Sequence, residues 1–581
     1  MRTILARLFL VAAVIMLASA GKTLAANSDT LVVYATPLSL DEVIKSDTLS
    51  DGTQAHKVYK LTTLDTTYIF LGPITVKSDF TVIGALGTDG RPPCIQPGIL
   101  GDGSQAFYLF VLNANGIKGT FKNLYLTGLA TNNTINQTNV NGVGALIQVS
   151  SDSIKLYVDN VIFEDWPENA ISYSGNMCDF FVTNCKFRNM ISATAWYSGE
   201  GIRNQTNSAV TDSMIMKYNT FLCINSYAAG PVTVSMVYYF DFSHNTIIYD
   251  FQNPFWIFNV TNAKVNDNLF YGSWAGAITK DEYTGFWDEL WSLEIGSLID
   301  LDTLDIAKSK VFDPADASDP NVRMLAEAKR VIEVKNNAYF MPKAVTDFWT
   351  AWDDTAHVDS ILAPQWMNNR TLGMFADKTH WPGLTESGNQ NVDPGFGSSI
   401  DQVLYNNQGN GVGLFQYFVD IRTGVAATDI YGYQLQSVTG SNWVPAWPLP
   451  EMTDMKYSNA ALKTASTDGL PVGDPGWFTN GYTGVAKTTG QVISKFALDN
   501  AYPNPFNPST TIKFNIAKAG IVSLKVYNIM GQLVRTVISN EYKDQGEYQL
   551  NLNMNNLSSG VYFYTLMQGS QQITKKMVLL K

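Results

Sequence analysis

Short apolar or aromatic runs recur along the first two thirds of the chain, and each follows an asparagine. Runs this short are typical of β-strands and lack the 3.6-residue period of amphipathic helices. The asparagine stands third in each of seven segments: FKNLYLTG (121–128), VDNVIFED (158–165), VTNCKFRN (182–189), KYNTFLCI (217–224), SHNTIIYD (243–250), NDNLFYGS (266–273) and KNNAYFMP (335–342).

The spacing of these asparagines indicates a repeat. They are Asn123, Asn160, Asn184, Asn219, Asn245, Asn268 and Asn337, and the intervals are 37, 24, 35, 26, 23 and 69 residues, the last being three times 23. A recurring interval of about 20–50 residues is typical of solenoids. Because the repeated unit carries strand-like runs, the pattern predicts an all-β chain built on a parallel β-helix.

Asparagine suits the corner of such a coil for two reasons. It tolerates the left-handed backbone conformation better than other non-glycine residues. Its amide can also hydrogen-bond to the same amide in the next coil, so that no buried polar group is left unpaired. We therefore predict that the seven asparagines form a structural ladder.

The N-terminal part of the repeat supports this fold. The stretch YIFLGPITVKSDFTVIGALGTDGRPPCIQPG (68–98) contains two strand-like runs followed by a turn rich in glycine and proline. Together with the asparagine repeat, it resembles the right-handed β-helix of pectate-lyase-like proteins over residues of about 60–400. The resemblance implies the fold, and family chemistry does not follow from it.

One segment interrupts the repeat. Phe286, Leu290 and Leu293 recur at helical spacing between Asn268 and Asn337. We predict a partly helical excursion over about 281–330, which either packs on the side of the solenoid or replaces part of two coils. The whole β-helix domain is expected to span residues 27–482, followed by a small, polar linker at 483–495.

The C-terminal block carries four motifs in order: Pro503-Asn504-Pro505-Phe506, then Val526-Tyr527-Asn528 with Gly531-Gln532, then Ser559-Gly560-Val561-Tyr562, and the basic pair Lys575-Lys576. The block resembles the C-terminal sorting domain of proteins exported by the type IX secretion system. The resemblance covers residues of about 496–581 and implies an immunoglobulin-like β-sandwich that acts as an export signal. Alternating apolar residues at 521–530 agree with strands.

The N-terminus predicts export as well. Arg2 and Arg7 flank the start of an apolar run at 8–18 that leads to small residues, as in a secretory signal peptide. The run is shorter than the roughly 20 residues of a membrane span. We expect the signal peptide to lie within residues 1–26, with Ala20, Ala25 and Ala26 as alternative cleavage positions. The mature protein is expected to reach the extracellular space or the outer-membrane surface through the periplasm.

The composition of the chain limits the range of expected binding partners. The net charge is −12 and no Lys/Arg cluster exists, which argues against nucleic acid or an anionic membrane as a partner. The four cysteines are expected to be buried free thiols, because an extended strand separates the nearest pair, Cys178 and Cys185, beyond bridging distance. No spacing typical of zinc ligands occurs, so no metal site is predicted.

The candidate site residues lie in the stretch WYSGEGIRNQ (196–205). Glu200 and Arg203 flank glycines and are the candidate catalytic residues, while Trp196 and Tyr197 are candidate sugar-binding platforms. This stretch belongs to an insertion at 191–207, and a second insertion lies at 131–144, roughly two coils earlier. If both insertions arise from equivalent turns of their coils, we expect the two insertions to form the walls of one groove.

Three functions follow as hypotheses. The first is a secreted or cell-surface β-helix protein that interacts with extracellular polysaccharide and uses the type IX secretion machinery through its C-terminal domain. The second is a polysaccharide lyase or glycoside hydrolase. The third is a non-catalytic structural or adhesive surface protein. No cofactor is evident, and calcium is expected only for a lyase, whose chemistry pairs a base with a Lewis acid.

Overall fold

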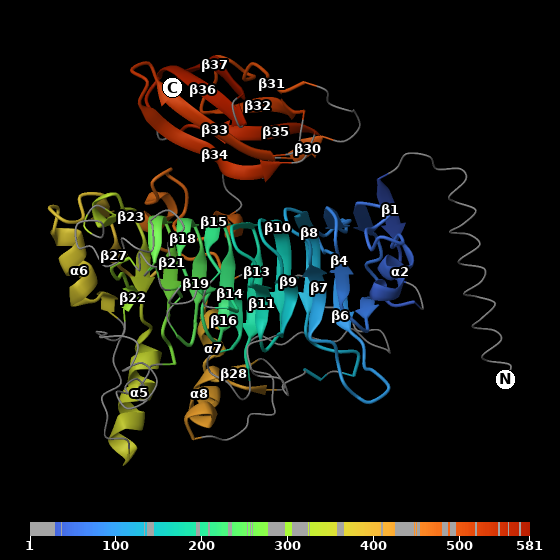
Figure 1. The fold of residues 1–581 in the computed structure, drawn as a ribbon. Helices are drawn as coiled ribbons and strands as arrows, with labels where there is room; N and C mark the ends of the chain where they lie inside the picture. Colours follow the sequence, from blue (N-terminus) through green and yellow to red (C-terminus); the bar gives the residue numbers. More distant parts are fainter. Residues whose placement is uncertain are drawn as a thin grey trace.

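The computed structural model consists mainly of a solenoid of parallel β-strands and a C-terminal antiparallel β-sandwich (Figure 1). The structure describes residues 29–581 except 36–37, 133, 136–143, 193–197, 207–208, 231–234, 253, 256, 258, 277–296, 305–323, 325, 357–364, 408–410, 424–446, 448, 450–453, 479–485, 489–494, 518–519, 544–545, 556 and 569–570. The expected signal peptide at 1–26 lies outside the described residues.

The coils of the solenoid form three faces, and strands of the third face occur only in the described coils from β4 to β17. The first face comprises β1 (Thr30–Val33), β2 (Val58–Leu61), β5 (Phe80–Gly84), β8 (Lys118–Thr127), β10 (Lys155–Glu164), β12 (Cys178–Thr183), β15 (Thr211–Lys217), β18 (Val237–Ser243), β20 (Val260–Asn266), β23 (Val331–Lys335) and β26 (Leu384–Ser387). Neighbouring strands in this order pair in parallel. The chain is therefore a parallel β-helix, whose coils begin near residue 30, earlier than the expected 60.

The second and third faces follow in the same coils. The second comprises β3 (Tyr68–Phe70), β6 (Cys94–Pro97), the ends of β8 and β10, β13 (Lys186–Met190), β16 (Thr220–Ile224), β19 (Thr246–Ile248), β21 (Leu269–Tyr271), β24 (Ala338–Phe340) and β27 (Gln390–Asn391). The third comprises β4 (Ile74–Val76), β7 (Tyr108–Leu112), β9 (Ala145–Val149), β11 (Asn169–Tyr173), β14 (Glu200–Asn204) and β17 (Ala229–Gly230). Because β8 and β10 run through both, the first two faces join into one 19-stranded sheet.

Identical positions of successive coils stack in the interior. The rings of Phe163 and Phe187 are parallel with centroids 4.9 Å apart, and those of Phe187 and Phe221 lie 4.5 Å apart. All three side chains are fully buried. Aromatic stacking between coils therefore stabilises the core of the solenoid.

The asparagines occupy two neighbouring rows. In the inner row, Nδ2 of each asparagine donates to Oδ1 of the asparagine in the next coil, at 2.9–3.1 Å. The same Oδ1 atoms accept the backbone N–H groups of the preceding coil. This row consists of Asn219, Asn245, Asn268, Asn337 and Asn389, and the first four are fully buried.

The remaining three asparagines belong to the adjacent row, which corrects the expected single ladder. Asn123, Asn160 and Asn184 have φ values of 55°, 53° and 57° and turn the chain. Asn160 donates to Asn123 at 2.9 Å, whereas Asn184 donates to Asp159 at 2.7 Å. The two proposed roles of asparagine, turning the chain and stacking amides, are thus divided between neighbouring positions.

The interval of 69 residues is a single coil. β20 pairs directly with β23, and Asn268 bonds to Asn337. The interruption is therefore an insertion between adjacent coils and does not replace coils. Most of the predicted helical excursion at 281–330 lies outside the described residues. Its described part includes β22 (Ser297–Ile299), which pairs with β25 (Gln365–Met367).

Several helices accompany the solenoid. α2 (Leu40–Ser46) precedes β2 and begins with a capping box formed by Ser39 and Glu42. On the outer side of the second face, apolar side chains of β16, β19 and β21 pack against α5 (Lys343–Ala356), α7 (Ser398–Gln402) and α8 (Leu414–Thr423). The remaining elements are α6 (Asn369–Ala376), β28 (Asn406–Asn407), β29 (Gly411–Val412) and the 3₁₀ turns η4 (Ala461–Thr464) and η5 (Pro475–Trp477).

The C-terminal strands form two antiparallel four-stranded sheets. One contains β30 (Ala486–Thr488), β35 (Gly546–Asn553), β32 (Ser509–Ile516) and β31 (Ala497–Leu498), and the other contains β34 (Leu533–Lys543), β33 (Gly520–Asn528), β36 (Gly560–Gln568) and β37 (Gln571–Leu579). Their apolar faces share one core. The stretch expected to be a linker contains a strand of this sandwich, since β30 lies within it and pairs with β35.

All four cysteines, which lie in described parts of the solenoid, are buried free thiols.

Candidate functional site

Two long insertions leave the solenoid at equivalent turns. The segment 131–144 connects β8 to β9, and the segment 191–199 connects β13 to β14. β8 and β13 both pair with β10, while β9 and β14 both pair with β11. The insertions therefore flank the short turn 165–168 of the coil between them. Trp196 and Tyr197, like most of the first insertion, lie outside the described residues.

Glu200 and Arg203 lie on β14, directly after the second insertion. Arg203 is in register with Ser172 of β11 and, one coil further, with Gln148 of β9. Nη1 of Arg203 lies 3.1 Å from Oε1 of Glu200. The Glu200 side chain is 3% exposed, and that of Arg203 is 24% exposed, so the ion pair is covered on its carboxylate side.

Several polar atoms around Glu200 are buried without a hydrogen-bond partner in the described structure. They are Oε2 of Glu200, Oδ1 of Asn169, Oγ of Ser198 and Oγ of Ser226. Backbone hydrogen bonds tie their segments together, since Ser226 N–H donates to Gly199 and Glu200 N–H to Glu168. Buried polar atoms are nearly always paired in native proteins, and an unpaired one costs about 1–3 kcal/mol. We call Asn169, Ser198, Glu200, Arg203 and Ser226 the Glu200 site.

Burial also changes the acidity of Glu200. Loss of solvent raises the pKa of its carboxyl to about 7, and the nearby Arg203 opposes this only in part. Protonated and ionised forms therefore coexist at neutral pH. A carboxyl in this state can donate a hydrogen bond or accept one.

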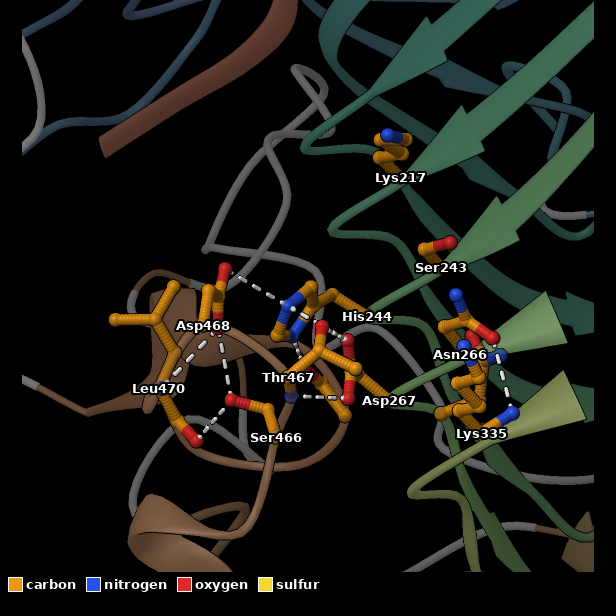
Figure 2. Close-up of polar contacts among 12 residues, drawn as sticks. Lys217, Ser243, His244, Asn266, Asp267, Lys335, Ser466, Thr467, Asp468 and Leu470 are labelled. Carbon is orange, nitrogen blue, oxygen red and sulfur yellow. Dashed lines mark hydrogen bonds and ion pairs between the residues drawn. The ribbon is translucent and has the colours of Figure 1, made fainter. Parts of the chain in front are cut away.

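A second polar region lies at the corner after the first face. It is an open cleft of about 340 Å³. Two residues of the C-terminal sandwich, Lys525 and Leu533, line it together with Thr467, Asp468 and the solenoid residues Lys217, Tyr218, Asp241, Ser243, His244, Lys264, Asn266, Asp267, Glu333 and Lys335. Several of these residues are drawn in Figure 2. Lys217 pairs with Asp241 at 2.8 Å, and Lys335 pairs with Glu333 at 2.6 Å. The first ion pair joins two neighbouring coils, and the second lies within one strand, so in each case the lysine is neutralised by a carboxylate.

His244 fastens a distant segment to this corner, as Figure 2 shows. Nε2 of His244 lies 3.2 Å from Asp468 and 3.6 Å from Asp267, and Nδ1 lies 3.3 Å from the carbonyl oxygen of Gly473. The backbone N–H of Thr467 donates to Asp267 at 2.7 Å. We call His244, Asp267, Thr467 and Asp468 the His244 clasp, and residues 454–478 the covering segment.

The clasp is charged. Burial lowers the pKa of His244, but Asp468 and Asp267 outweigh it and raise that pKa to about 9. Burial likewise raises the pKa of Asp468, but His244 outweighs it and lowers that pKa to about 2. His244 is therefore an imidazolium ion at neutral pH, with both ring nitrogens able to donate. It serves to hold the covering segment and is not a free base.

Other contacts also hold the covering segment against the solenoid. Trp477 Nε1 donates to the Thr220 hydroxyl at 2.7 Å, and that hydroxyl donates to Asp474 at 2.9 Å. Lys186 lies 5.0 Å above the Trp477 ring. Sequence reasoning missed the clasp, because Thr467 and Asp468 follow their partners Asp267 and His244 by 200 and 224 residues. The only local signal was a polar or charged residue at the turn position before the inner asparagine, as in His244 and Asp267.

The described residues offer no evident metal centre, since they contain no group of three or more His, Cys, Asp or Glu side chains placed to hold an ion. They also contain no helix long and apolar enough to cross a membrane.

Comparison with known proteins identifies one part of the chain. Residues 500–580 match the family described as Secretion system C-terminal sorting domain. Comparisons of the chain with curated proteins and with solved structures found no match. The matched residues contain strands β32 to β37 of the C-terminal sandwich and its four sequence motifs. Residues 500–580 are therefore a type IX secretion system C-terminal sorting domain, which directs this β-helix protein to the cell surface or the extracellular space.

Proposed function

We propose that the β-helix binds extracellular polysaccharide at the Glu200 site. The observation that carries the proposal is the group of four buried polar atoms without partners, on Asn169, Ser198, Glu200 and Ser226. A ligand that supplied hydrogen bonds to these atoms would remove the cost of burying them unpaired. The site thus favours a ligand rich in hydroxyl groups.

The chemistry of the site supports a saccharide over other polar ligands. Oδ1 of Asn169 only accepts hydrogen bonds, whereas the serine hydroxyls and a protonated Glu200 can also donate. Sugar hydroxyls match both roles. Arg203 offsets the charge of Glu200, so the site favours a neutral or weakly charged glycan. Export to the cell surface or the extracellular space, which the sorting domain indicates, is compatible with such a ligand.

Binding can be tested with the mature protein on a glycan array, followed by calorimetry with the best ligand. Glu200→Ala removes hydrogen bonds to an ionisable group, so we expect at least about a tenfold loss of affinity, in line with about 1.5–3 kcal/mol for such bonds. Asp212→Asn, which alters an exposed carboxylate on β15, is the matched control and should leave affinity unchanged. Absence of glycan binding, or equal affinity in the Glu200 variant, would contradict the proposal.

One observation favours catalysis as a second candidate function. A carboxyl with a pKa of about 7 is suited to general acid catalysis near neutral pH. In that case Glu200 would protonate the leaving oxygen of a glycoside or, in a lyase, assist elimination, and a lyase would also require calcium. Product analysis separates these outcomes: new reducing ends indicate hydrolysis, unsaturated ends indicate a lyase, and unaltered ligand leaves a binding protein. A protein that neither binds nor cleaves glycans would instead be a structural or adhesive one.

A further inference from the structure

The sorting domain displays an exposed apolar turn between β33 and β34. Ile529 is 71% exposed, Met530 is 74% exposed and Leu533 is 51% exposed. They are three of the six strongly exposed large hydrophobic residues in the described part of this domain, and they fall within five positions. The neighbouring Leu524 and Val526 of β33 are fully buried, so the apolar pattern of the strand does not account for this exposure.

Hydrogen bonds hold the turn in one conformation. Oδ1 of Asn528 accepts the backbone N–H groups of Met530 and Gln532, both at 3.0 Å, and its Nδ2 donates to the Gln532 side chain at 2.8 Å. The backbones of Asn528 and Gln532 also pair at 3.0 Å. Gly531 has a φ of 78°, which glycine adopts without strain.

This rigidity matters for recognition. An apolar side chain presented on a preorganised turn loses little conformational freedom on binding, so more of its burial contributes to affinity. A few apolar anchors inserted in a pocket commonly dominate the energy of a protein interface. Ile529 and Met530, side by side at the tip, have the form of such anchors.

The flanking residues favour a protein over a lipid surface as the partner. Ile529 and Met530 at the tip are bordered along the chain by neutral polar residues, and the nearest basic residues in the sequence are Lys525 and Arg535. Lys525 and Leu533 line the polar cleft beside the solenoid, whereas Ile529 and Met530 are not part of its lining. Arg535 donates to the carbonyl oxygen of Asn553 within the domain. Membrane-surface attachment relies on clustered basic residues beside the apolar ones, and the turn lacks this cluster in the sequence.

We propose that the turn Asn528–Leu533 is the surface by which the secretion machinery reads the sorting domain, with Ile529 and Met530 inserted into an apolar pocket of a machinery protein. The proposal rests on the sorting domain and is independent of glycan binding. A sorting domain must be recognised through exposed groups, whereas the apolar motif residues Phe506, Val526 and Tyr562 lie in its core.

The test uses the full chain expressed in a bacterium that has type IX secretion. Ile529→Asp combined with Met530→Asp should reduce the surface-delivered fraction at least tenfold, with the protein accumulating in the periplasm. Tyr502→Asp changes another exposed hydrophobic residue, 80% exposed, and is the control that should be exported normally. Normal export of the double variant, or equal loss in the control, would overturn the proposal.

Two further measurements separate recognition from folding. Equal thermal melting of the purified full-length double variant and wild-type protein would show that the sandwich is intact. A photoreactive amino acid at position 529 should then crosslink to a component of the secretion machinery during export. Crosslinks to lipid alone would overturn the proposal in favour of membrane contact.

Discussion

The Glu200 site and the His244 clasp are both buried polar groups on the same solenoid, yet they differ in how their atoms are paired. In the clasp, His244 forms ion pairs with both Asp267 and Asp468, and Asp267 also accepts the backbone N–H of Thr467. In the Glu200 site, four buried atoms have no hydrogen-bond partner in the described structure. The pairing of their polar atoms therefore distinguishes these two regions, whereas burial does not.

The strongest test of this comparison removes the centre of the clasp. His244→Ala leaves Asp267 and Asp468 buried without their counter-charge, which typically destabilises a protein by about 3–5 kcal/mol. We expect either that loss in urea unfolding or release of the covering segment, detected as faster proteolysis within 454–478. Lys343→Ala, which breaks an exposed ion pair with Asp347, is the control and should have little effect. Unchanged unfolding and proteolysis would show that the clasp does not hold the segment.

The two asparagine rows allow the next test. Asn245→Leu should cost about 1–3 kcal/mol, because it leaves an amide N–H and a carbonyl of neighbouring coils unpaired. Asn184→Gly retains the left-handed turn and removes only an exposed contact with Asp159, so it should cost less than about 1 kcal/mol. Denaturant melts of the two variants measure the difference. Equal losses would indicate that the rows share one function.

The pH dependence of the clasp follows from the pKa values. The pKa of His244 is raised to about 9 in the folded protein, so its stabilisation is complete below about 6.5 and is lost as pH rises through 9. The pKa of Asp468 is lowered to about 2, so its stabilisation is complete above about 3.8 and is lost as pH falls through 2. The stability difference between wild type and His244→Gln should thus be largest between about pH 4 and 6.5. A difference that grows above pH 9 would contradict this assignment.

The smallest expected effect on stability is at Glu200. Because the raised pKa means that ionisation is unfavourable in the folded state, Glu200 disfavours folding as pH rises from about 4.5 through 7. Glu200→Gln removes that charge, and we expect unfolding free energies within about 1 kcal/mol of wild type, together with weaker glycan binding. A loss as large as that of His244→Ala would make Glu200 a structural residue and remove the contrast between the two regions.

Local patterns in the sequence were sufficient for the architecture. Strand-length apolar runs at a recurring spacing predicted the parallel β-helix, and ordered motifs predicted the sorting domain that the family match identifies. These features depend on interactions within a strand, a turn or neighbouring coils. The left-handed turn at Asn123 or Asn160 is likewise a property of the residue and its own backbone.

The tertiary structure alone decided which of these residues meet. A shift of one position along the chain separates the inner row of Asn219 from the turn row of Asn184, and only strand pairing sets that register. Only the direct pairing of β20 with β23 showed that 69 residues form one coil. His244 and Asp468 lie 224 residues apart and meet because the covering segment packs across several coils. Such contacts depend on how whole elements pack, and no short-range pattern specifies that packing.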